Sequence, residues 1–158
     1  MLAVVLVVQV AVTWALVGLI WTIQLVHYPL LAGIAVEAYP RWQRLHMTRI
    51  TAVVGPLMIV EGFTAAMLLL LAWRDGPRAL VPWALAGGLL LVLVWLSTAL
   101  LQAPAHGRLT AGFDPALHRW LVRTNWLRTL LWSGRGVLLA LLLVRVLQGG
   151  LAGWGGDL

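Results

Sequence analysis

Three histidines lie at the ends of long apolar stretches, where few other polar residues occur. His27 and His106 follow such stretches, and His46 precedes one. Imidazole titrates near neutral pH, which suits acid–base catalysis, and neutral imidazole is the commonest metal ligand. With a carboxylate the three would suit zinc, iron or copper, and two of them would suit a haem iron. No His-x-x-x-His or Glu-x-x-His spacing occurs, so hydrogen-bonding helix caps stay open as an alternative; His118 is expected to be a solvated helix residue.

Two charged residues, Glu61 and Arg135, lie well inside apolar stretches. A charge at the centre of a bilayer costs at least about 2.5–3.5 kcal/mol, so such residues normally face inward and find partners. We therefore predict that Glu61 and Arg135 meet between helices. The pair either fixes the register of the helices or forms the floor of a ligand cavity, in which Glu61 would take part in catalysis.

A polar stripe follows one face of the last apolar stretch. Its members are His118, Asn125, Arg128, Trp132 and Arg135. Their spacing of seven, three, four and three residues aligns them on a helix that turns about 100° per residue. Arg49 and Arg128 suit either bidentate binding of an anionic group or anchoring to lipid phosphate. The candidate substrate-binding residues are Tyr28, Arg49, Gln102, Asn125, Arg128, Trp132 and Arg135.

The composition requires a membrane around these residues. Of 158 residues, 62% are hydrophobic, and the mean hydropathy is +0.95. A soluble domain uses roughly 45–50% apolar residues and could not bury this excess. Four stretches reach the roughly 20 residues that a helix needs to cross the hydrocarbon core. They cover residues 2–26, 50–73, 80–101 and 126–144, which predicts one all-α domain over 1–158, a four-helix transmembrane bundle.

The basic residues predict an orientation in the membrane. The net charge is +6 and every basic residue apart from histidine is arginine, but the arginines flank apolar stretches, so nucleic-acid binding is not expected. By the positive-inside rule the connections between spans 1 and 2 and between spans 3 and 4 face the cytoplasm of a bacterium, with both termini outside its plasma membrane. These connections carry seven arginines: Arg41, Arg44, Arg49, Arg108, Arg119, Arg123 and Arg128.

The connections also predict where helices begin. Tyr39-Pro40 and Asp114-Pro115 resemble helix starts, so spans 2 and 4 should begin two or three turns before the membrane. The segment 74–78 reads as a tight turn that makes spans 2 and 3 a hairpin. Gln24-x-x-His27 before Pro40 and Gln102-x-x-x-His106 before Pro115 suggest a faint internal repeat of two hairpins, related by an axis along the membrane normal.

The chain resembles the anthrone-oxygenase-like family, small four-helix membrane proteins that are mostly of unknown function. The resemblance rests on Val26-His27-Tyr28-Pro29 and on Asn125-Trp126-Leu127-Arg128-Thr129 followed by Trp132. It implies oxidation of a flat aromatic substrate, with His27, Asn125 and Arg128 as the residues carried over. The stretches from His46 to Glu61 and from Gln102 to His106 depart from the family pattern.

The leading hypothesis is a membrane-embedded oxidoreductase that acts on a hydrophobic or aromatic substrate. Its pocket would open at the end of the bundle that carries the 1–2 and 3–4 connections, with His27, His46 and His106 as metal or haem ligands or as acid and base. A binder or carrier of a small molecule, a proton or an anion is the first alternative, and a structural subunit of a membrane complex is the second. Catalysis predicts a closed pocket, transport a polar path that reaches both sides, and a subunit a large exposed apolar face.

Overall fold

Four long helical rods make up the chain in the computed structural model, which describes residues 1–74 and 78–154. Each is long and apolar enough to cross a membrane, and the predicted all-α four-helix bundle is confirmed. The rods comprise α1 (Leu2–Thr22) with α2 (Tyr28–Ala32), α3 (Tyr39–Arg74), α4 (Val81–Ser97) with α5 (Ala103–Leu109), and α6 (Pro115–Trp154). A short 3₁₀ turn, Arg78–Leu80, precedes α4. Residues 75–77 of the turn predicted at 74–78 lie outside the described residues.

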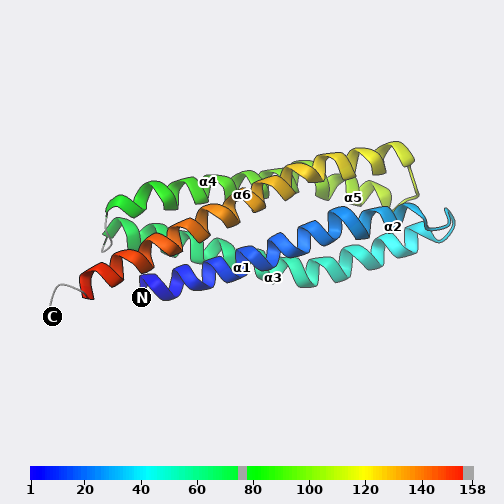
Figure 1. The fold of residues 1–158 in the computed structure, drawn as a ribbon. Helices are drawn as coiled ribbons and strands as arrows, with labels where there is room; N and C mark the ends of the chain where they lie inside the picture. The colour runs from blue at the N-terminus through cyan, green and yellow to red at the C-terminus, as the bar shows by residue number, and fades with distance from the viewer. Residues whose placement is uncertain (75–77, 155–158) are drawn as a thin grey trace.

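The rods lie side by side along their length (Figure 1). Helix α1 packs against α3 and α6, and α4 packs against the same two helices, so the bundle has a four-sided cross-section. The start of α1 and the end of α6 lie at one end, and the α2–α3 and α5–α6 connections lie together at the other (Figure 1). We call the latter the connection end. The polar residues that end the first and third rods therefore meet those that begin the second and fourth.

The helix starts lie where the sequence predicts them. Helix α3 begins at Tyr39, and α6 begins at Pro115. The Asp114 carboxylate caps α6, because its Oδ1 accepts hydrogen bonds from the backbone N–H groups of Ala116 (2.8 Å) and Leu117 (3.1 Å). This satisfies donors that a helix start otherwise leaves free. The rods consequently extend past the apolar stretches at the connection end.

A π-helical turn joins the two parts of the first rod and of the third rod. The turns cover Ile23–His27 and Thr98–Gln102. A proline follows two residues after each turn, Pro29 and Pro104. Proline has no N–H to donate and its ring clashes with the carbonyl four residues earlier, so a wider turn relieves both problems. Residues five apart then share a face, which directs Gln102 to the interior, where it accepts a hydrogen bond from the Ser97 hydroxyl at 3.0 Å.

The two π turns reveal a regular spacing between the halves of the chain. The second turn begins 75 residues after the first (98 minus 23). The same interval separates Pro40 from Pro115 at the starts of α3 and α6 (115 minus 40). Pro29 and Pro104 are separated by this interval too, so the prolines recur at the same interval as the π turns. In this register His27 corresponds to Gln102, rather than Gln24 to Gln102 as the sequence motif suggested.

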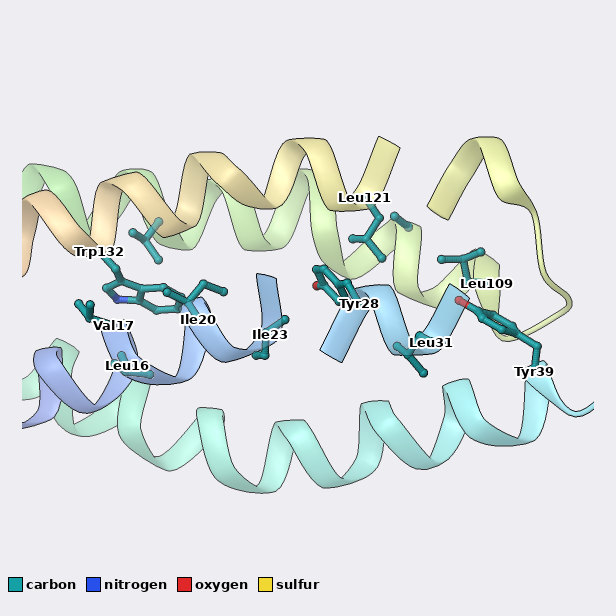
Figure 2. Packing of buried hydrophobic residues seen from close by; sticks show 12 residues of the cluster. Leu16, Val17, Ile20, Ile23, Tyr28, Leu31, Tyr39, Leu109, Leu121 and Trp132 are labelled. Carbon is teal, nitrogen blue, oxygen red and sulfur yellow. The ribbon is translucent and has the colours of Figure 1, made fainter. Parts of the chain in front are cut away.

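Two apolar clusters fill the bundle. The larger one lies toward the connection end and includes Trp132, which packs against Leu16, Val17 and Ile20 of α1 (Figure 2). Tyr28 belongs to the same cluster, nearer the connection end (Figure 2). The smaller cluster lies toward the termini and consists of Leu6, Leu68, Ala72, Ala84, Leu139 and Leu142. Between the two clusters lies a band of buried polar side chains, which we call the polar band: Gln9, Thr13, Glu61, Thr64 and Arg135.

The arginines at the connection end divide into two kinds. Six of the seven that support the orientation are exposed there: Arg41, Arg44, Arg49, Arg108, Arg119 and Arg123. Arg128 is only 8% exposed and faces the interior. The six exposed residues still outnumber Arg74, Arg78 and Arg145 near the other end.

Candidate functional site

A pocket of about 240 Å³ lies inside the bundle toward the connection end. All four rods line it, mostly with aliphatic side chains, and the Trp132 indole lies at its wall. Its main polar side chains are Tyr28, His46, Thr98, Gln102, His106 and Arg128. Thr51 on α3 and Ala103 on α5 also line it and are exposed, so the pocket reaches the surface between these two helices and is not the closed pocket that catalysis predicts. A small apolar chamber with a few convergent polar groups is typical of a ligand site.

His27 and His46 form a hydrogen-bonded pair of imidazoles. His27 Nε2 lies 2.7 Å from His46 Nδ1, and the ring centroids are 4.4 Å apart. His46 lines the pocket, whereas His27 is half-buried and does not. Among the described residues the hydrogen bonds of His46 involve only Nδ1. Its Nε2 is therefore available to a ligand.

His106 is held by two polar side chains. Tyr28 Oη lies 3.0 Å from Nε2, and Gln43 Nε2 lies 2.8 Å from Nδ1. A neutral imidazole has one donor and one acceptor nitrogen, and here both are engaged. The phenol and the imidazole line the pocket together. They form a second hydrogen-bonded pair, opposite His46, whose ring centroid is 5.2 Å from that of His106.

The geometry of the three histidines bears on the predicted metal site. His27, His46 and His106 do gather at the connection end, but two of them bond to each other and the third bonds to Tyr28 and Gln43. In the described part of the chain no group of three or more His, Asp or Glu side chains is placed to hold a metal ion. Iron at the free Nε2 of His46 would leave the hydrogen bond to His27 in place, but His106 would have to give up a hydrogen bond to act as a second ligand. The arrangement fits acid–base groups and does not fit a three-histidine ligand set.

Arg128 reaches the pocket from α6 and is oriented by an amide network. Its Nε donates to Asn125 Oδ1 at 2.9 Å, its Nη2 donates to the same oxygen, and its Nη1 lies 3.5 Å from Thr98 Oγ1. Asn125 Nδ2 donates in turn to Gln24 Oε1 at 2.6 Å. Gln24 is tied to α6 by a bond of 3.2 Å to the carbonyl oxygen of Val122. Asn125 is fully buried and acts on the pocket through Arg128.

Glu61 and Arg135 form the ion pair that the sequence predicts. Arg135 Nε lies 3.0 Å from Glu61 Oε1, and both side chains are almost fully buried. Thr13 Oγ1 donates to Oε1 at 2.9 Å, and Trp132 Nε1 donates to Oε2 at 3.2 Å. Arg135 Nη1 also donates to the Gly87 carbonyl oxygen. Neither charged residue lines the pocket, so the pair lies beyond Trp132 instead of forming the cavity floor itself.

The polar band extends farther toward the termini than the sequence suggested. Thr64 Oγ1 donates to Gln9 Oε1 at 2.6 Å, and Gln9 Nε2 donates to Thr13 at 3.3 Å. Beyond Gln9 and Thr64 the smaller apolar cluster fills the bundle. Over the residues that the structure describes, polar side chains do not continue through that cluster.

Two predicted residues lie elsewhere than expected. Arg49 is exposed and does not line the pocket, because it falls on the outer face of α3. His118 was expected in solvent but is 5% exposed. Its ring contacts Phe113 and Tyr28 at centroid distances of 5.7 and 6.4 Å. The long start of α6 brings it beneath the α5–α6 connection, which the sequence alone does not show.

Several site residues were missed at the level of sequence. They are Gln9, Thr13, Gln43, Thr64 and Thr98. A signal exists for some of them: Gln9 and Thr13 are four residues apart in an apolar span, and Gln43 precedes His46 by three. Polar residues at such spacings share a helix face. Threonine in a membrane helix can also bond its own backbone, so its type alone does not indicate a site.

Fold and site together define an integral membrane protein with an internal pocket, built as a four-helix bundle. Comparison of the chain with family models, curated proteins and solved structures found no match. The resemblance to the anthrone-oxygenase-like family therefore stays a prediction.

Proposed function

We propose that this chain is a membrane-embedded enzyme that binds a small, planar, lipid-soluble molecule and removes a proton from it. The observation that carries the proposal is His46, whose Nδ1 is bonded to His27 at 2.7 Å while its ring lines an apolar pocket. An imidazole held through one nitrogen and open at the other is the arrangement of a general base. No acid–base role is needed from Glu61, which Arg135 neutralises.

The proton would leave the pocket through the histidine pair. With Nδ1–H donated to His27 Nε2, neutral His46 has a lone pair on Nε2 to accept a proton from the substrate. The resulting imidazolium passes its Nδ1 proton to His27, which releases one from its own Nδ1. His27 is half-buried, so this second ring lies between the pocket and the exterior. Positioned proton transfer of this kind contributes typically about 10²–10⁴-fold to a rate.

The other groups of the pocket would hold the substrate. Deprotonation of carbon beside a carbonyl leaves negative charge on oxygen, and the Tyr28 hydroxyl supplies a hydrogen bond to that oxygen. His106 fixes the position of the Tyr28 hydroxyl at 3.0 Å. Trp132 offers a flat surface for an aromatic ring. The opening beside Thr51 and Ala103 would admit a hydrophobic molecule from the bilayer.

Oxidation of the substrate, as the family resemblance implies, would follow proton removal and would need an electron acceptor in addition to these residues. A carrier is less well supported, because the apolar cluster around Leu68 and Leu139 lies across the bundle beyond the polar band. In the orientation that the exposed arginines favour, the connection end faces the cytoplasm of a bacterial cell. His27 would then deliver its proton to that side.

Deuterium exchange tests the proposal. Anthrone is a planar ketone with weakly acidic methylene hydrogens, and proton NMR in D₂O follows their loss in detergent micelles. The wild-type chain should accelerate exchange over protein-free micelles, His46→Gln should return it to background, and the exposed Arg49→Gln should match wild type.

Filling the pocket with a larger side chain provides a second, independent test of the proposed function. Gly55 lines it, and a Cβ there would meet only Thr51 Cγ2 at 4.0 Å, so Gly55→Leu should fill the space without a backbone clash. Gly88 has nothing within 4 Å of such a Cβ and lies outside the pocket, so Gly88→Leu is the control. Background exchange by folded wild type, or full exchange by His46→Gln, would contradict the proposed function.

A further inference from the structure

The buried charges of the bundle do not cancel. Among the described residues the buried carboxylate is Glu61, and the buried guanidiniums are Arg135 and Arg128. Arg135 forms an ion pair with this carboxylate, with its Nε 3.0 Å from Glu61 Oε1. Arg128, 8% exposed, has no acidic side chain within 4 Å in the described ranges and lines the pocket. A buried cation without a counter-ion is unfavourable in hydrocarbon, and such residues normally pair.

The partners of Arg128 are neutral and leave donors free. A guanidinium has five N–H groups. Nε and Nη2 donate to Asn125, and Nη1 makes a long contact of 3.5 Å to Thr98. Two N–H groups therefore have no hydrogen-bond partner among the described residues and are free for a ligand. Asn125 Nδ2 in turn donates a hydrogen bond to Gln24 Oε1 at 2.6 Å. The Arg128 guanidinium is therefore held in place before a ligand binds.

The pocket limits the size of the missing anion. Its volume of about 240 Å³ is below the roughly 300–1,000 Å³ of most small-molecule sites, and most of its wall is aliphatic. A two-chain phospholipid would not fit, but a planar acid of up to three fused rings would. Its ring would lie against the aliphatic wall and the Trp132 indole, and its acidic oxygen would lie at Arg128.

Building on the proposed function, we infer that the ligand of this pocket is a small lipid-soluble organic acid, bound as a carboxylate or enolate whose negative oxygen is paired with Arg128. The bound ligand supplies the counter-ion that the chain lacks. In the proposed reaction the same guanidinium would stabilise the charge that proton removal leaves on the substrate.

A pair of isosteric probes tests this inference on the unaltered chain. The full-length protein in phosphatidylcholine nanodiscs is dialysed at neutral pH against 2-naphthoate, which is ionised, and against 2-naphthamide, which is neutral. Empty nanodiscs give the lipid background. We expect naphthoate to bind roughly tenfold more tightly than naphthamide or better, because a hydrogen bond to a charged group contributes this much more to affinity than a neutral one. Arg128→Gln should remove the preference and Arg128→Lys should keep part of it, while the exposed Arg49→Gln should leave it unchanged.

The other outcomes distinguish a failure of this inference from a failure of the proposed function. Equal binding of acid and amide, both blocked by Gly55→Leu, would overturn the anion assignment and leave the proposed pocket standing. Absence of binding by either probe would overturn both. Displacement of naphthoate by glycerol 3-phosphate, the polar part of a phospholipid, would assign Arg128 to a lipid headgroup and overturn the small-acid ligand. Should the Arg128 variants fail to fold, the acid-to-amide ratio of the wild type still decides the question.

Discussion

The indole nitrogen of Trp132 donates a hydrogen bond to Glu61 Oε2 at 3.2 Å, which connects the wall of the pocket to the ion pair beyond it. Glu61 Oε1 is engaged by Arg135 at 3.0 Å and by Thr13 at 2.9 Å. Each carboxylate oxygen thus has a donor, and three helices are tied together at one level. The ion pair orients Trp132, and Trp132 shapes the pocket.

Removal of one partner of the ion pair should be more damaging than removal of both. Arg135→Met leaves Glu61 charged and fully buried, and we expect a loss of about 3–5 kcal/mol in the free energy of unfolding. The double variant Glu61→Leu/Arg135→Met should lose less, because no charge is left unpaired. Unfolding by sodium dodecyl sulfate, followed by circular dichroism, measures both. Equal losses in the single and double variants would mean that an unpaired, buried Glu61 carries no penalty, which would contradict this prediction.

Two adjacent glycines on α4 should differ sharply in their tolerance of alanine. A Cβ on Gly87 would lie 3.2 Å from Arg135 Nη1, so Gly87→Ala should displace the guanidinium and cost about 1–3 kcal/mol. A Cβ on Gly88 meets nothing within 4 Å, so Gly88→Ala should be neutral or stabilise the helix by up to about 1 kcal/mol. The same unfolding assay compares them. Similar values for the two would contradict the close approach of Arg135 to α4.

His27→Gln should separate proton relay from ligand binding. Glutamine can still hydrogen-bond His46 Nδ1 but cannot pass a proton on, so the maximal rate of anthrone exchange should fall roughly tenfold or more. The anthrone concentration that gives half the maximal rate should stay the same, because His27 does not line the pocket. A wild-type rate would exclude His27 from the proton path.

Asn125→Asp should supply from within the chain the counter-ion that we assign to the ligand. The new carboxylate would occupy the oxygen position that already accepts from Arg128 Nε at 2.9 Å. The preference for naphthoate over naphthamide should then disappear, since the guanidinium is neutralised before the ligand binds. Asn125→Ser, which adds no charge, serves as the comparison. A preference that survives in Asn125→Asp would mean that Arg128 does not select the acid.

Much of the architecture follows from local sequence. An apolar stretch of about 20 residues must satisfy its backbone within itself in lipid, so composition alone determines four helical spans. Pro40 determines where the second rod begins, and Asp114 with Pro115 determines where the fourth begins. The meeting of Glu61 with Arg135 could also be predicted, because an unpaired charge at that depth is too costly.

The pocket and its partners required the tertiary structure. The sequence places His27, His46 and His106 at one end of the bundle, but it does not say that the first two bond to each other while the third bonds to Tyr28 and Gln43. Nor does it show that Arg49 faces outward while Arg128 faces the pocket, since both are arginines at the same end of a span. Spacing along one helix fixes which residues share a face. Which residue of a face turns inward, and what it meets there, depends on packing among four helices, because aliphatic side chains face both the lipid and the core.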